Sequence, residues 1–250
     1  MKQTILNTNQ STLLENLIVK HGQIVTSEQI YSQAEDLWDQ QRTKKVIAKL
    51  VHNGLLIRVK RGLYAISDLS NRGFLSLSPY VVAHLLVKDS YVSFESALAY
   101  HGMFDQLTNK TISISQVQYK SVQLQSVEYS FVKVLDKWFF GWQDVSIDNK
   151  TVRMATAEKA LIDMIQFHKS KYTVDLVVEK LSLYKSPLDL QKMTEYLGKM
   201  SLTTVKTFGL LFDLLGIDSG DLYSQVKLKG THWMFSHDAK FNAKWRLYYD

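Results

Sequence analysis

Seven basic side chains and no acidic ones lie between Gln40 and Arg61. These bases are Arg42, Lys44, Lys45, Lys49, Arg58, Lys60 and Arg61. A run of cations without carboxylates favours an anionic partner such as the phosphate backbone of a nucleic acid. A solvated basic surface without any partner is the alternative, and charge alone does not separate the two.

The first part of this segment has the period of an amphipathic helix over residues 39–53. Val46, Ile47, Leu50 and Val51 form one apolar stripe, and Gly54 follows where a helix commonly ends. The opposite face carries polar and basic residues, with Arg42 and Lys49 at its borders. That face consists of Gln41, Lys44, Lys45, Ala48 and His52.

A short basic hairpin is expected directly after this helix. Apolar and basic residues alternate from Leu55 to Lys60, the pair Arg61-Gly62 makes a turn, and residues 63–66 return as a second strand. Upstream, helices are expected over residues 12–21, capped by Ser11, and from Thr26 or Ser27 to about Ala34. Three helices followed by a β-ribbon is the order of a winged helix-turn-helix domain, which we expect over residues 1–75.

In such a domain the third helix places its N-terminal half in the major groove of DNA. Gln41, Lys44 and Lys45 would then meet base edges, whereas Arg58, Lys60 and Arg61 on the wing would contact phosphates. A winged helix can instead dock onto a protein. The DNA-binding set predicted from the sequence is Gln41, Arg42, Lys44, Lys45, Lys49, Arg58, Lys60 and Arg61.

Residues 76–250 are expected to form a larger α+β domain with a helical C-terminal part. From Thr111 the hydrophobic period changes to two, which predicts strands of an antiparallel or mixed sheet. Helices are expected after Ser93 and Thr156 and from the pair Ser186-Pro187. The strands are expected at 111–115, 127–135, 145–147 and 151–154, further helices at 173–185 and 203–215, and possible strands in 232–250.

Composition narrows the class of protein. The chain has 250 residues, of which 46% are hydrophobic, and it contains no cysteine, which excludes disulfides and thiolate metal sites. No apolar run is long enough for a membrane span and no secretory signal is apparent, so a cytoplasmic location is expected. Residues 1–75 hold ten Lys/Arg against six Asp/Glu, and the remainder holds twenty against eighteen. The positive charge is therefore concentrated at the N-terminal side.

Enzymatic alternatives rest on few residues. Asp148 and Lys150, with Asp136 upstream, have an acid–x–Lys spacing used by metal-dependent nucleases, but Asp148-Asn149 is also ordinary hairpin-turn chemistry, and we favour the turn. The sequence lacks the Asp-x-Asp pair of a nucleotidyltransferase, and it lacks phosphate-cradling glycine motifs. No cofactor or metal is therefore expected, and Lys159 is expected to be exposed on its helix.

Several segments in order resemble the AbiE-type antitoxins. They are RVKRGLYAI at 58–66, YVSFESALAYHGM at 91–103, the strand at 111–115, VRMATAEKALIDMI at 152–165 and FNAKWRLYYD at 241–250. The resemblance implies a non-enzymatic type IV antitoxin of a phage-defence system that acts by abortive infection. Its winged helix would repress its own operon at inverted repeats, as a dimer or cooperatively, and its larger domain would counteract a nucleotidyltransferase toxin. Two alternatives are a stand-alone regulator that senses a ligand or partner, and a metal-dependent nuclease.

Overall fold

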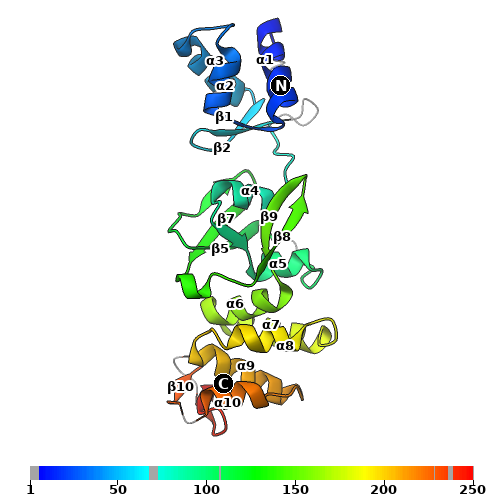
Figure 1. Ribbon diagram of the computed structural model, residues 1–250, viewed down its shortest axis with the longest axis vertical. Helices are drawn as coiled ribbons and strands as arrows, with labels where there is room; N and C mark the ends of the chain where they lie inside the picture. Colours follow the sequence, from blue (N-terminus) through cyan, green and yellow to red (C-terminus); the bar gives the residue numbers. More distant parts are fainter. Residues whose placement is uncertain (1–5, 68–72, 107, 228, 236–238, 250) are drawn as a thin grey trace. The chain divides into compact units, whose positions relative to one another are not determined.

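The protein consists of two compact units (Figure 1). A computed structural model describes residues 6–67, 73–106, 108–227, 229–235 and 239–249. Unit 1 comprises Met1–Leu86 with Leu124–Ser126, and unit 2 comprises Val87–Gln123 with Val127–Asp250. Both units combine helices with β-sheet, which confirms the α+β class expected from the sequence.

Unit 1 packs helices on a small antiparallel sheet of order β1-β3-β2. Its elements are α1 (Thr8–His21), β1 (Ile24–Thr26), α2 (Ser27–Ala34), α3 (Gln40–His52), β2 (Leu56–Lys60), β3 (Leu63–Ile66) and α4 (Pro79–Leu86). Strands β2 and β3 form the expected hairpin, and α4 begins at Pro79, where a proline after Ser78 predicts the first turn of a helix. The polar, glycine-containing sequence of residues 68–78 predicts a linker, of which residues 68–72 lie outside the described part.

Side-chain caps explain where the helices of unit 1 begin. Thr26 accepts a hydrogen bond from the backbone N–H of Gln29 and the Gln29 side chain accepts one from the N–H of Thr26, so both ends of a capping box are present. Asn7 and Gln10 form the same arrangement at α1. The expected cap Ser11 is therefore wrong, because the Asn7 box starts the helix one turn earlier.

The core of unit 1 comes from the apolar stripes that the sequence shows. Leu13 and Leu17 of α1, Ile30 of α2 and Leu50 of α3 are all buried in one cluster. Fully burying side chains of this size contributes about 1.5–3 kcal/mol each. The stripe of α3 thereby fixes which face of that helix remains at the surface.

Unit 2 is built on a mixed sheet of six strands in the order β6-β7-β5-β4-β9-β8. The strands are β4 (Ser90–Val92), β5 (Lys110–Ser115), β6 (Val122–Leu124), β7 (Val127–Lys133), β8 (Trp142–Ile147) and β9 (Lys150–Ala155). The pairs β5–β7 and β4–β9 are parallel, whereas β4–β5 and β8–β9 are antiparallel. Asp148 and Asn149 both have positive φ at the β8–β9 turn, which confirms the predicted hairpin.

Helices and a second small sheet complete unit 2. They are α5 (Phe94–Tyr100), the 3-10 helix η1 (Asp136–Trp138), α6 (Ala157–Phe167), α7 (Lys171–Leu183), α8 (Leu190–Leu197), α9 (Leu202–Leu214) and α10 (Gly220–Val226), followed by β10 (His232–Trp233), β11 (Lys240–Asn242) and β12 (Leu247–Tyr249). Among the described residues, no helix is both long enough and apolar enough to cross a bilayer.

One predicted helix start in unit 2 is confirmed without its capping bond, and another is wrong. Ser93 makes no capping bond at α5, because its hydroxyl donates to Asp163 instead, at 2.7 Å. The pair Ser186-Pro187 does not open a helix; α8 starts later, where Asp189 accepts from the N–H of Lys192 at 2.9 Å. Thr156 caps α6 as expected.

Candidate nucleic-acid interface

Helix α3 presents the predicted residues on its solvent face. Asp39 caps the helix by accepting from the N–H of Arg42 at 2.8 Å, and Thr43, Ile47 and Leu50 face the core. The burial of that side leaves the other side in solvent. Exposed side chains on it are Gln41, Arg42, Lys44, Lys45, Ala48, Lys49 and His52.

The structure brings part of α3 together with the hairpin. A hollow of about 450 Å³ is lined by residues of α2, α3, β2 and β3, among them Lys44 and Arg58. A second hollow, of about 460 Å³, is lined by Gln41, Lys44, Lys45 and Ala48. Lys44 lines both hollows, and four of the predicted residues line one or the other of them.

The other four predicted residues lie outside these hollows. Arg42 and Lys49 are exposed on α3, and Arg61 is exposed at the β2–β3 turn. Lys60 is only half exposed, and its Nζ donates to the backbone carbonyl of Leu86 at 3.1 Å. A phosphate would have to compete with that bond, so Lys60 is the least available of the predicted bases.

Sequence reasoning missed the polar side chains that share the α2–α3 hollow. Ser27 and Tyr31 of α2 line it, and Tyr64 lies directly across the ladder from Arg58. Tyr64 also packs against the core cluster. Ser27 and Tyr31 had no charge or motif to mark them, and only the packing of α2 beside α3 reveals their position.

The charge at this surface is uneven. The ion pairs of the described residues include none of the α3 bases, so no carboxylate in that part of the chain pairs with those cations. Towards the start of α3, a hollow of about 380 Å³ is lined by Glu35 and Asp39. A polyanion would be attracted along the basic face and repelled at that acidic end.

In unit 2 the densest group of ionisable side chains is fully buried. Lys159 and Asp163 of α6 form an ion pair one helical turn apart, and Tyr91 accepts from Lys159 Nζ at 2.9 Å. The Tyr91 hydroxyl donates to Asp163 Oδ2 at 3.2 Å, as Ser93 does. The prediction that Lys159 is exposed is therefore wrong: the amine is held by Asp163 and Tyr91 and packs over the ring of Phe140 at 4.8 Å.

Burial is the main cause of the pKa shifts in this group. It lowers the pKa of Lys159 and raises that of Asp163, while the attraction between the two charges opposes both shifts. The pKa of Tyr91 is raised well above its ordinary value by burial and by the nearby Asp163 carboxylate. Since the partners satisfy one another away from solvent, the cluster serves the fold and offers no access to a substrate.

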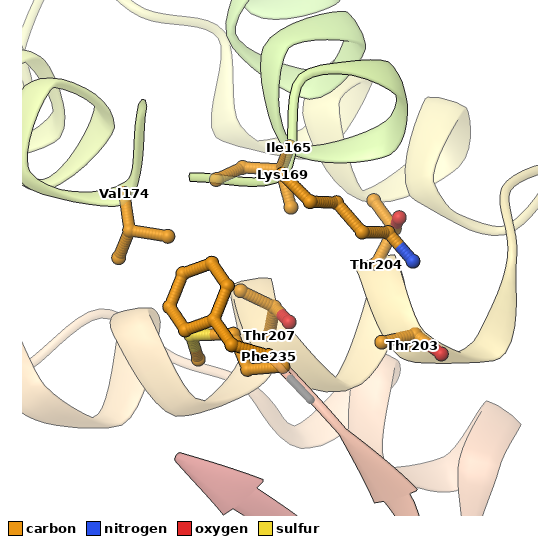
Figure 2. A pocket seen from close by; sticks show the side chains of 8 residues that line it. Ile165, Lys169, Val174, Thr203, Thr204, Thr207 and Phe235 are labelled. Carbon is orange, nitrogen blue, oxygen red and sulfur yellow. The ribbon is translucent and has the colours of Figure 1, made fainter. Parts of the chain in front are cut away.

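Two small hollows lie among the described residues of unit 2. One of about 10 Å³ lies among α6, α7, α9 and the segment after β10, which is space for about one water molecule (Figure 2). Figure 2 shows the ring of Phe235 facing Val174, and the Lys169 side chain extending toward Thr204. Another hollow of about 150 Å³ is lined by Glu95 and Tyr172. Within the described residues, no group of three potential metal ligands is found; Asp136 lies in η1 and Asp148 in the β8–β9 turn.

Comparison with known proteins identifies a solved structure with a similar fold. No family model matches the chain, and no curated protein matches it. Among solved structures, the chain is similar to the crystal structure of the RV2827C protein from Mycobacterium tuberculosis, with a TM-score of 0.69 and 14% sequence identity. The match covers 97% of this chain and 92% of that chain, so the likeness extends over both units. At this identity it concerns the fold alone.

Proposed function

We propose that unit 1 is a winged helix-turn-helix domain that binds duplex DNA through α3 and the β2–β3 hairpin. The observation that carries the proposal is the exposed basic face of α3, which forms no ion pair among the described residues and shares a hollow with Arg58 of the hairpin. The order α1-β1-α2-α3-β2-β3, with the sheet order β1-β3-β2, supports it. Placing α3 in the major groove would bring the hairpin to the adjacent backbone.

The side chains suggest a division of tasks on the DNA. Gln41 can read an adenine through two hydrogen bonds, and Ala48 can contact a thymine methyl group. Lys44 and Lys45 can reach guanine or a phosphate, and Arg58 and Arg61 would neutralise phosphates without reading sequence. Two protomers on an inverted repeat would place two α3 helices in successive grooves.

We further propose that the whole chain acts as an antitoxin. It would repress its own operon through unit 1 and counteract a nucleotidyltransferase toxin through unit 2. The ordered resemblance of five segments to AbiE-type antitoxins supports this assignment, and four of the five fall in unit 2. The action would be non-enzymatic and would take place in the cytoplasm.

A cell-based experiment tests both halves together. The variant Lys44→Ala/Lys45→Ala is expected to lose repression of a reporter driven by the DNA upstream of its own gene, yet to relieve the toxicity of the neighbouring gene product as well as the parent chain does. The variant Lys20→Ala/Lys120→Ala is a matched loss of two charges away from α3 and should behave as the parent in both assays. Repression by the α3 variant at the parental level would contradict the DNA-binding proposal, and toxicity unrelieved by the parent chain would contradict the antitoxin proposal.

A further inference from the structure

The last sheet of unit 2 carries three aromatic side chains in one row. In the strand order β10-β12-β11, Tyr248 of the central strand lies opposite Trp233 on one side and opposite Phe241 on the other. Residues in register across neighbouring strands point to the same face of a sheet. The row Trp233–Tyr248–Phe241, here called the aromatic row, therefore spans the full width of this sheet.

The rings of the aromatic row contact one another and remain open at both ends. Trp233 and Tyr248 stack in parallel, with centroids 5.0 Å apart and planes 7° apart, and Phe241 lies against Tyr248 at 4.9 Å. Trp233 is 51% exposed and Phe241 is 48% exposed. These are the two edge strands, so a planar group could extend the stack on the outer face of either ring.

The sheet is fixed firmly to α9 by the residues around Trp245. Trp245 is buried, and its ring lies so close to Gly209 that a Cβ there would be 2.2 Å from it. Its indole N–H donates to Asp213 Oδ2 at 2.7 Å, and Lys244 Nζ donates to Asp213 Oδ1 at 2.7 Å. The row is thus held on a rigid support, which lowers the entropic cost of binding.

A second anchor lies at the start of β10. Lys206 of α9 is buried, and its Nζ donates to the carbonyls of Lys229, at 2.7 Å, and of Gly230. The same amine is 3.1 Å from Nδ1 of His232. The chain leading into the Trp233 strand is therefore tied to the same helix as Trp245.

The surroundings of the aromatic row carry a net positive charge. Residues 221–250 hold five Lys/Arg and three Asp, namely Asp221, Asp238 and Asp250, and the five basic side chains are all exposed. These cations are Lys227, Lys229, Lys240, Lys244 and Arg246. Lys244 is paired with Asp213, which leaves four outside the ion pairs described for this region. Exposed rings surrounded by cations fit a ligand that is planar and anionic.

We propose that the aromatic row binds single-stranded nucleic acid. Unpaired bases would stack on the outer faces of Trp233 and Phe241, and exposed cations of this segment would attract the sugar–phosphate chain. A duplex cannot use this surface in the same way, because its bases are already stacked on one another. The inference goes beyond the proposed function of unit 1, since it concerns another unit and another form of nucleic acid.

Fluorescence anisotropy with labelled oligonucleotides tests this directly on the full-length chain. Short oligouridylate and oligothymidylate are the probes, with an unlabelled duplex as competitor. Trp233→Ala is expected to weaken binding of the single strand by about tenfold or more, because base–aromatic stacking is lost. Phe241→Ala should weaken it by a similar factor. Stronger binding of one probe would identify RNA or DNA as the preferred strand.

Matched variants separate this surface from the rest of the chain. Tyr172→Ala removes an aromatic ring of 52% exposure on α7 and should leave the affinity unchanged. Lys44→Ala/Lys45→Ala should also leave single-strand binding intact, so that failure of the proposed duplex site is distinguishable from failure of this one. Circular dichroism and thermal melting of each variant check that the fold is kept.

Three results would overturn the proposal. The first is parental affinity of Trp233→Ala and Phe241→Ala for both probes. The second is single-strand binding that disappears in the Lys44→Ala/Lys45→Ala variant. The third is a parent chain that is dimeric by light scattering and becomes monomeric in Trp233→Ala, because the row would then be covered by a second copy of the chain.

Discussion

The lysines of α3 differ from Lys159 and Lys206, two buried lysines of unit 2, in what surrounds them. Lys44 and Lys45 lie in solvent beside concave surface, with no ion pair among the described residues. Lys159 and Lys206 are buried, and each amine is bonded to oxygen atoms of its own unit. All four lie on helices, so a helical position alone does not assign a role.

This difference shows how a basic sequence should be read for function. A buried ammonium group is costly to desolvate and persists only where the protein supplies partners. The pKa of Lys206 is lowered by burial and by the charge of Arg246, whereas it is the exposed lysines that can exchange counterions for phosphates. Only the exposed cations should enter a charge-based argument for a nucleic-acid partner.

The largest expected effect comes from a substitution at the buried Lys159. Lys159→Met removes the partner of Asp163 and leaves a carboxyl group buried without its counter-charge. The free energy of unfolding, measured by urea denaturation, should fall by roughly 3–5 kcal/mol. Lys45→Met, the same change on the exposed face of α3, should shift it by less than about 0.5 kcal/mol.

A double substitution tests the ion pair more specifically. Lys159→Met combined with Asp163→Leu removes both charges and should recover a substantial part of the lost stability, because no uncompensated charge remains. A double variant that is less stable than Lys159→Met alone would show that the pair stabilises the fold by its own attraction. Equal stability of Lys159→Met and the parent would refute the buried ion pair altogether.

A smaller effect is expected where α9 supports the aromatic row. In Gly209→Ala the new methyl group would meet the Trp245 ring, which must shift by more than 1 Å from the 2.2 Å contact. We expect a loss of about 2 kcal/mol, since overpacking outweighs the better helix propensity of alanine. Urea denaturation gives the loss, and a changed near-ultraviolet circular dichroism spectrum would report the displaced indole.

Gly230→Ala is the control, since its Cβ would have only a 3.5 Å contact. A Gly209→Ala variant as stable as the parent would contradict the close packing.

The smallest effect concerns Asp213 and has a defined pH dependence. Partial burial tends to raise its pKa, but hydrogen bonds from Lys244, Ser219 and Trp245 outweigh it and hold the pKa below the ordinary 3.8. A carboxyl group whose pKa is lower in the folded state than in the unfolded state stabilises the fold at pH values above its ordinary pKa. That stability is lost as the pH falls through the folded-state pKa. Asp213→Asn should therefore cost about 1 kcal/mol at neutral pH. The difference from the parent should shrink below about pH 4, and a constant difference across pH would contradict this assignment.

Local signals predicted much of the fold. The stripe of α3, the turn at Arg61-Gly62, the caps Thr26 and Thr156 and the Asp148-Asn149 hairpin all depend on neighbours in sequence. What could not be predicted depends on distant partners. Ser93 donates to Asp163, seventy residues away, and Lys159 is buried because Tyr91 and Phe140 surround it.

The candidate interface follows the same rule. The exposure of the α3 bases was predicted from helical period, and their exposure in the structure agrees with it. The retention of Lys60 by the Leu86 carbonyl depends on α4, and the contribution of Ser27 and Tyr31 depends on α2. The aromatic row was visible in the sequence only as an aromatic, basic segment, because its register across three strands is a property of the fold.

The most direct measurement is a fluorescence-anisotropy titration of the full-length protein against the duplex upstream of its own gene, at two salt concentrations. Tight binding relative to a scrambled duplex is expected, with an affinity that falls steeply with salt. In Lys44→Ala/Lys45→Ala the salt slope should decrease by about 2. Affinity equal to that for the scrambled duplex, or an unchanged slope in the double variant, would contradict a DNA-binding role for α3.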